Sequence, residues 1–433
     1  MNMLQKQKLE SLINANLLVS TGCTEPIAIA YASAMARKTL NETPVSIELK
    51  LSGNMAKNAM NAGVPGSEYV GAAFVAALGA LFADPTRGFE LLEGLTKEQQ
   101  EVAYEFSKKH VKIQIADTDK PLYIEAIVNG GMCKIEGCCA CRCCNSARVV
   151  VADGHTSIQS IEYNGEPIST VSVSTGTKAT NDEKFEEVNF TMKEIYEYVE
   201  ELKDFSIFRK AVNLNMALSK EGKTKAWGLD VGKIHPFGQE NVFSRIVSAT
   251  TSGVDARMAG AELPAMACTG SGNQGITVTL PIYQLAKELN KSEDDTYRAV
   301  AVGILSAIYI KQHLSVLSHL CGAVIASSGS AAGMTYLLGG NYHQAESAIQ
   351  NVIASVVGMF CDGAKNTCAL KVAACVSMAI YAAHLALTDT GCINSDVGIA
   401  CKDIEGTMKN VAQIEKKSSK VMDETILSII TNS

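Results

Sequence analysis

The chain has 433 residues, of which 47% are hydrophobic, 19% charged and 6% aromatic. This composition excludes a disordered chain and favours closely packed helices over a β-sandwich. The formal charge of −7, with no long basic stripe, argues against a nucleic-acid partner. The longest apolar stretches, 299–310 and 372–383, are shorter than the roughly 20 residues that span a membrane. Since the N-terminus also lacks a signal-peptide pattern, we expect a cytoplasmic protein without a membrane partner.

The first part of the chain mixes both periodicities. Helical patterns are followed by strand-like runs, and the strands after residue 110 indicate a small antiparallel sheet. The predicted helices are 3–17, 27–40, 55–63, 69–82 and 97–110, and the predicted strands are 45–51, 111–116, 122–129, 147–152 and 155–163.

Residues 164–181 are rich in Gly, Ser and Thr, which indicates a linker. Beyond Met192 nearly every segment has a helical pattern, interrupted by Gly-rich turns at 269–275 and 339–341. We therefore expect an α+β fold: a small N-terminal α+β domain over 1–180, with an antiparallel sheet, and a mostly α-helical C-terminal domain over 181–433.

Fourteen cysteines are unusual for a large cytosolic chain. Cys361 and Cys368 lie on either side of a six-residue turn, and Cys321 lies 40 residues before Cys361. The intervening segment has the pattern of a helical hairpin, which would return the chain to Cys321. Three thiolates with a vacant fourth position describe a [4Fe–4S] cluster with one open iron, which acts as a Lewis acid. Three buried core cysteines would fit the same spacing.

Cys23 lies in the turn Ser-Thr-Gly-Cys-Thr-Glu-Pro, just before a predicted helix. A helix N-terminus favours an anion and lowers the pKa of a nearby thiol. Cys23 is therefore a candidate reactive thiolate, although contact with the cluster or a plain capping position would also fit.

Two turn-to-helix junctions offer N–H donors to a substrate carboxylate. The first contains Ser52 and Asn54, and the second contains Ser271, Gly272, Asn273 and Gln274. Lys365, and less directly Lys57 and Asn366, would add charge or hydrogen bonds. Taken alone, the second junction also fits a flexible loop.

Five thiols fall within the seven residues of Cys138–Cys144, with Cys133 close by. Such a segment could hold zinc or copper(I), but no second ligand pair with zinc-finger spacing follows it. A thiol-rich metal-binding or redox-sensing protein is therefore the alternative from another functional class. His155 and His319 are secondary site candidates, and we assign no role to four further cysteines: Cys268, Cys375, Cys392 and Cys401.

These motifs together resemble iron–sulfur L-serine dehydratases. The stretch 321–368, with its Gly- and Ala-rich helix and closing cysteine pair, is similar to their α domain, and 269–275 is similar to their Gly/Ser substrate loop. Two features differ: Cys23 stands where those enzymes carry histidine, and the closing pair is more tightly spaced. Both are similar to the L-cysteine desulfidase branch, which combines Thr-Gly-Cys-Thr-Glu-Pro with Cys-Asp-Gly-Ala-Lys-x-x-Cys.

The resemblance implies a serine dehydratase alpha-like helical domain whose Cys321, Cys361 and Cys368 hold a [4Fe–4S] cluster with one open iron. It implies an oxygen-sensitive lyase, independent of pyridoxal phosphate, that converts L-cysteine to pyruvate, ammonia and hydrogen sulfide, with Cys23 as the base. The alternative substrate is L-serine or another β-substituted amino acid. The expected partner is this small amino acid, and a homo-oligomer stays open.

Overall fold

The computed structural model describes residues 2–131, 145–168, 190–235, 238–314, 318–388, 391 and 398–432. The chain forms two compact units, neither of which is continuous in sequence. The sheet unit comprises Thr21–Lys184, Asp362–Ala364 and Val421–Ser433, and the helical unit comprises Met1–Ser20, Phe185–Cys361 and Lys365–Lys420. The structure therefore differs from a division at residue 180 in two respects. Residues 1–20 belong to the helical unit, and residues 362–364 and 421–433 belong to the sheet unit.

The sheet unit is built on six strands in the order β3-β2-β4-β5-β6-β7. All neighbours pair antiparallel except β2 and β3, which are parallel, with Ile47 opposite Val111. The α+β class and the antiparallel sheet are thus confirmed, and the parallel pair is an addition that the strand pattern did not indicate. The strands are β2 (Pro44–Leu51), β3 (Val111–Ile115), β4 (Tyr123–Gly130), β5 (Ser146–Ala152), β6 (Ile158–Tyr163) and β7 (Glu166–Pro167).

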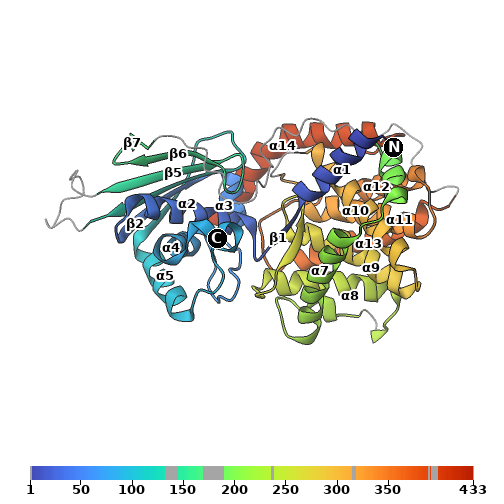
Figure 1. Ribbon diagram of the computed structural model, residues 1–433, viewed down its shortest axis with the longest axis horizontal. Coiled ribbons are helices and arrows are strands. Elements are labelled where there is room, and N and C mark those ends of the chain that lie inside the picture. Colours follow the sequence, from blue (N-terminus) through green and yellow to red (C-terminus); the bar gives the residue numbers. More distant parts are fainter. Residues whose placement is uncertain are drawn as a thin grey trace. The chain divides into compact units, whose positions relative to one another are not determined.

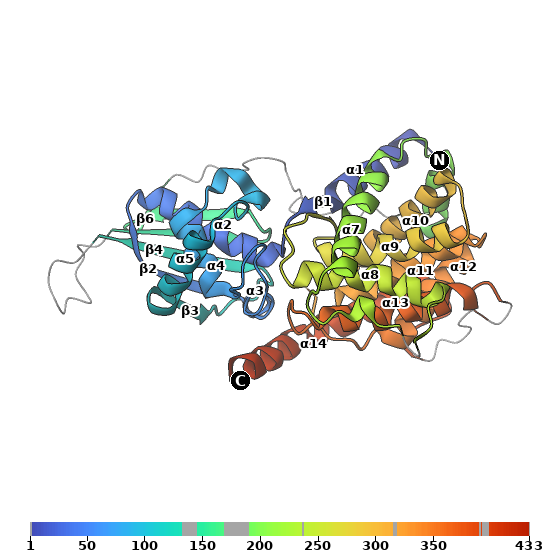
Figure 2. The ribbon, with the colours of Figure 1, turned by 90° about the horizontal axis from the view of Figure 1, so that it is seen from below.

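Alternation along the strands determines which face of this sheet is covered. Ile47 and Leu49 in β2 and Ile124 in β4 are fully buried, whereas the charged Lys50 and Glu125 point to the other side. Helices α2, α4 and α5 lie on the apolar face (Figures 1 and 2). The helices of this unit are α2 (Thr24–Leu40), α3 (Gly53–Ala59), α4 (Ala72–Phe82) and α5 (Lys97–His110), with the 3-10 turn η1 (Pro85–Glu90) before α5.

The helical unit packs around two central helices, α9 and α11, which contact each other and most of their neighbours. A two-stranded antiparallel pair, β1 (Leu17–Ser20) with β8 (Ala265–Cys268), lies beside α9. The remaining elements are α1 (Met3–Asn16), α6 (Met192–Glu201), α7 (Ser206–Thr224), η2 (Val231–Lys233), α8 (Val242–Met258), α9 (Gly272–Glu288), α10 (Glu293–Gln312), α11 (Gly322–Leu337), α12 (Tyr342–Val356), α13 (Cys368–Leu385) and α14 (Ile404–Asn432), whose last turns from Val421 belong to the sheet unit.

Small residues allow the backbones of α10 and α11 to approach closely. A Cβ atom added to Gly329 of α11 would lie 2.5 Å from the carbonyl oxygen of Gly303 in α10. Only glycine fits at this contact, because any side chain would separate the two helices. The close packing keeps α11, and with it the N-terminal end that carries Cys321, in a fixed position within the unit.

Among the described helices, α13 alone is long and apolar enough, by length and composition, to cross a membrane. Its Ala369, Val372 and Cys375 are buried, and the helix packs against α8, α11 and α12. These contacts bury one face of α13 in the helical unit, while Leu370 and Tyr381 are exposed.

Candidate functional site

An isolated backbone bridge brings two of the predicted cluster cysteines together. Leu320 and Phe360 pair antiparallel, the amide of Cys321 donates to the carbonyl of Met359 at 2.9 Å, and the amide of Cys361 donates to the carbonyl of His319 at 2.8 Å. The helical hairpin of α11 and α12 lies between the two cysteines in the sequence and returns the chain to this point.

The third cysteine begins α13. The amide of Cys368 donates to the carbonyl of Lys365 at 2.9 Å, which closes the turn between Cys361 and the helix. We call Cys321, Cys361 and Cys368 the thiol triad. The first of these is the N-cap residue of α11 and the last is the first residue of α13, so two helix N-termini are directed toward this region of the helical unit.

The neighbouring thiols affect the pKa of Cys321. Burial raises the pKa of Cys321, and the nearby Cys361, Cys375 and Cys368 raise it further. The fourth cysteine, Cys375, is fully buried in α13, and burial raises its pKa to about 12. Its Sγ lies 3.6 Å from Met359 Sδ, which is a packing contact in the core. Sequence analysis assigned it no role, and its position agrees with a core residue.

The thiol triad fits an iron–sulfur cluster by its donor chemistry. Three thiols gather there, of which Cys321 is buried and the other two are partly exposed, and a metal stabilises the Cys321 thiolate that burial alone disfavours. Within the described ranges, no three His, Cys, Asp or Glu side chains converge closely enough for a single metal ion. A cubane cluster does not require such convergence, because each of its three ligated irons takes its own thiolate.

The loop Thr269–Gly275, which we call the glycine loop, lies next to the first thiol of the triad. A Cβ atom added to Gly322 would lie 2.9 Å from the Cγ, Cδ and Nε2 atoms of Gln274. Gly322 directly follows Cys321, so the predicted substrate-loop residue and the predicted cluster ligand meet within one unit. The hydroxyl of Thr269 donates to Gln274 Oε1 at 2.8 Å and fixes the orientation of this side chain.

Two residues at the end of α8 contact the side chain of Asn273. Arg257 Nη1 donates to Asn273 Oδ1 at 2.9 Å, and Asn273 Nδ2 lies 3.2 Å from Met258 Sδ. The Arg257 guanidinium also occupies the space that a Cβ atom on Gly272 would need. Sequence analysis missed Arg257, because a lone arginine in a helical pattern gives no spacing signal.

Cys23 is the N-cap residue of α2 in the sheet unit and is 5% exposed. Two residues later, Glu25 accepts a hydrogen bond from Asn58 Nδ2 at 3.3 Å, which ties the start of α2 to α3. Gly22 has a φ of 85° and packs on the ring of Pro65, so the turn before Cys23 depends on glycine. The predicted position of Cys23 at a helix N-terminus is therefore what the structure contains.

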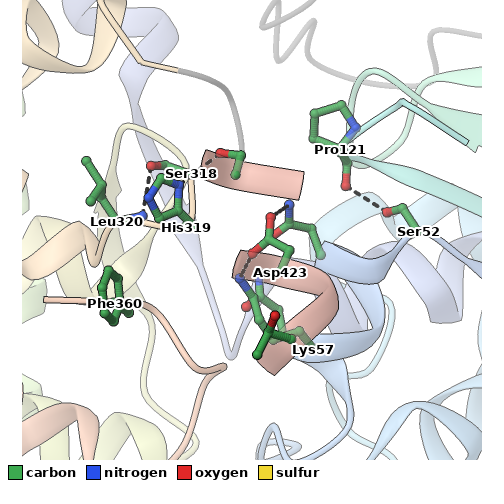
Figure 3. A network of polar contacts seen from close by, with 12 residues as sticks. Ser52, Lys57, Pro121, Ser318, His319, Leu320, Phe360 and Asp423 are labelled. Atoms are coloured by element: carbon green, nitrogen blue, oxygen red, sulfur yellow. Dashed lines mark hydrogen bonds and ion pairs between the residues drawn. The ribbon is translucent and has the colours of Figure 1, made fainter. Parts of the chain in front are cut away.

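Ser52 and Asn54 were predicted to bind the carboxylate of a substrate, but both side chains have partners within the protein. Ser52 is the N-cap of α3, and its hydroxyl donates to the carbonyl of Pro121 at 2.7 Å. Asp423 accepts from Lys57 Nζ at 2.6 Å and from Asn54 Nδ2 at 2.7 Å (Figure 3). Lys57 is fully buried and Asp423 nearly so, which makes this a buried ion pair. Sequence analysis missed Asp423, which lies 366 residues from its partner.

His319 and Lys311 complete the polar groups around the thiol triad. His319 is buried, with Nδ1 2.9 Å from Ser419 Oγ and Nε2 3.2 Å from Ser418 Oγ, and its ring stacks on Phe360 (Figure 3). Burial lowers the pKa of Lys311 to about 8, while the nearby Glu415 and Cys361 act in the opposite direction.

Three groups of predicted residues remain. Lys365 contributes its carbonyl to the turn before α13, and His155 lies in the turn between β5 and β6. The Cys138–Cys144 segment, Cys133 and Cys392 lie outside the described residues.

Comparison with known proteins identifies the family. The model of the serine dehydratase alpha chain matches residues 86–428. The chain is 36% identical to a UPF0597 protein of Bacteroides thetaiotaomicron, covering 99% of this chain and 98% of the relative. It is 36% identical to one of Oleidesulfovibrio alaskensis, covering 97% of each, and 37% identical to one of Shewanella oneidensis, covering 99% of each. The chain therefore belongs to the serine dehydratase alpha chain family, as its motifs predicted.

Proposed function

We propose that this protein is an iron–sulfur-dependent lyase that removes the β-substituent of a small amino acid, and that its substrate is L-cysteine. The observation that carries the proposal is the contact between Gln274 of the glycine loop and Gly322, next to Cys321. This contact puts a candidate amino-acid loop beside the thiol triad, and family membership supports lyase chemistry.

In this proposal the thiol triad holds a [4Fe–4S] cluster with one open iron. When bound, the cluster supplies Lewis acidity that stabilises the charge developing on the departing sulfur or oxygen. The protein must then do three further things: hold the substrate carboxylate, remove the Cα proton, and release the product.

We assign these tasks to the protein's own residues. The N–H groups at the start of α9, with Ser271, Gly272 and Gln274, receive the carboxylate, because a helix N-terminus favours an anion. Cys23 takes the Cα proton as a thiolate. Loss of HS⁻ from the β-carbon gives aminoacrylate, which tautomerises and adds water. L-cysteine and water thus become pyruvate, ammonia and hydrogen sulfide.

L-Serine is the second candidate substrate, and the family description favours it. With serine the leaving group is hydroxide, and the same aminoacrylate follows. Cys23 in place of a histidine, together with the short spacing between Cys361 and Cys368, supports cysteine. A thiolate also has a softer sulfur than an alkoxide oxygen, which suits iron in a sulfide environment.

The direct test is turnover by the protein reconstituted anaerobically with iron and sulfide. Pyruvate should form from L-cysteine with one sulfide per pyruvate, and at a higher kcat/KM than pyruvate from L-serine. A higher kcat/KM for L-serine would favour the dehydratase instead. Absence of product from both amino acids, with the cluster intact, would refute the lyase proposal. Deletion of the Cys138–Cys144 segment addresses the metal-binding alternative, because a lyase keeps its cluster and activity without it.

The role of Cys23 predicts a separation between cluster content and turnover. In Cys23→Ser, kcat should fall by roughly 10²–10⁴, the usual contribution of a general base, while iron content stays unchanged. Exchange of the substrate Cα hydrogen with deuterated solvent should disappear in parallel. Cys401→Ser, the same change at a half-buried cysteine in the helical unit, serves as the control. Loss of iron in Cys23→Ser would make Cys23 a ligand instead of a base.

A further inference from the structure

Two arginines connect α8 to α9, one at each end of the antiparallel helix pair. At the far end from the glycine loop, Arg245 donates to Glu288 through Nε at 2.9 Å and Nη2 at 2.7 Å, a two-point ion pair. At the near end, Arg257 donates through Nη1 to the neutral side chain of Asn273 at 2.9 Å. The near contact thus ties Arg257 to a residue of the glycine loop.

Burial also distinguishes them. The Arg245 side chain is 34% exposed, whereas Arg257 as a residue is 6% exposed. Arg257 therefore carries a charge into the interior of the helical unit, directly against the first turn of α9. Its guanidinium packs where the Cβ of Gly272 would be, so that glycine is required by the arginine behind it.

We propose that Arg257 is a positioning residue for carboxylate recognition: it holds Asn273 and packs against Gly272, so that the start of α9 presents its N–H groups in a fixed orientation. The proposal rests on the proposed function, since it assumes that the glycine loop receives the carboxylate of an amino acid. It adds the residue that gives the loop its selectivity for substrates that carry a carboxylate.

Arg257 and Met258 hold the Asn273 side chain, so that it braces the loop while the backbone N–H groups at the start of α9 serve the ligand. These N–H groups have no partner within the first turn of a helix and favour an anion. An amine without the carboxylate would gain nothing from their fixed orientation.

The test compares two ligands that differ by the carboxylate: L-cysteine and cysteamine, with L-serine and ethanolamine as the pair if serine is the better substrate. In the cluster-loaded Arg257→Gln variant, KM for L-cysteine should rise about tenfold, which corresponds to one hydrogen bond from the start of α9 to the carboxylate being lost through misalignment. The inhibition constant of cysteamine should change less than about twofold, because it reports binding without the carboxylate. Arg257→Lys, which retains the charge without the planar fork, should show an intermediate KM.

Arg245→Gln is the matched control, because it removes an arginine contact between the same two helices away from the loop. It should leave both constants unchanged. Equal weakening of L-cysteine and cysteamine in Arg257→Gln, or an unchanged KM, would overturn the assignment. If Arg257→Gln does not fold, KM for L-cysteine and the inhibition constant of cysteamine are compared in Arg257→Lys instead. If the wild-type protein turns over neither amino acid, the proposed function fails first, and this inference fails with it.

Discussion

Replacing Gly322 with alanine puts one methyl group where the Gln274 side chain now lies. The added Cβ would be 2.9 Å from three Gln274 atoms, closer than side-chain carbons approach in folded proteins. The backbone around Gly322 need not move, because the obstructing atoms belong to a side chain that can rotate. The substitution therefore acts on the glycine loop while every thiol of the triad is retained.

The substitution has two effects on the free energy of unfolding, and they partly offset each other. Displacing Gln274 breaks the buried hydrogen bond from Thr269, at a cost of about 1–2 kcal/mol. Alanine at the start of α11 offsets up to about 1 kcal/mol of this through its helix propensity. The free energy of unfolding should thus fall by about 2 kcal/mol at most. If Gln274 contacts the substrate, KM should nevertheless rise about tenfold, which corresponds to ~1.4 kcal/mol of lost binding.

The assay measures thermal unfolding, iron content and the KM and kcat of one anaerobic preparation. Gly358→Ala is the control, because it adds a methyl group three residues before Cys361 where no other atom lies within 4 Å. A normal KM in Gly322→Ala with full iron content would refute the reasoning that the glycine loop contacts the substrate beside Cys321.

Three further predictions concern the cluster and the stability of the sheet unit. Alanine at any one position of the thiol triad should remove the visible sulfur-to-iron absorption of the reconstituted protein, and three single variants that all keep it would contradict the ligand assignment. Burial would raise the pKa of Glu125, but hydrogen bonds from Arg148, Tyr123 and Lys50 outweigh it and lower that pKa from 4.5 to about 2. The ionised carboxylate thus stabilises the fold above pH 4.5 by about 3 kcal/mol, and this contribution declines as the pH falls toward 2. Urea unfolding should show Glu125→Gln less stable than wild type at pH 7, with less than half that difference at pH 3; a constant difference would exclude this role. Asp423→Ala should lower the free energy of unfolding by about 3–5 kcal/mol, because it leaves the buried Lys57 ammonium without its carboxylate. Adding Lys57→Met should restore most of the free energy of unfolding that Asp423→Ala loses, in the same measurement. A double variant as unstable as the single one would show that the buried unpaired charge is not the cause.

Local patterns predicted the elements well where one physical cause dominates. Alternation identified β2, and helical periodicity identified α4 and α5. Pro26 was expected to open the helix after Cys23, whereas α2 begins at Thr24 with Pro26 within its first turn, where proline is tolerated. That difference brings Cys23 directly to the N-cap position.

Long-range partners were beyond such patterns. Leu17 pairs with Cys268 and Lys57 with Asp423, and no local periodicity encodes which distant segment supplies the partner. The proximity of the three thiols could be predicted, because the segment between Cys321 and Cys361 has the pattern of a helical hairpin, which returns the chain to its starting point. The contacts of Arg257 with Gly272 and Asn273 could not, because they arise between helices that are far apart in the local pattern.

The Leu320–Phe360 bridge has a consequence for how the protein is repaired. Its two amide–carbonyl bonds, from Cys321 to Met359 and from Cys361 to His319, join the two cysteine segments through backbone atoms. In a small zinc finger, by contrast, the metal itself holds the chain together. In the proposed iron–sulfur enzyme these backbone bonds should therefore keep the two segments paired when the cluster is lost to oxidation. Repair would then require iron and sulfide but no new protein.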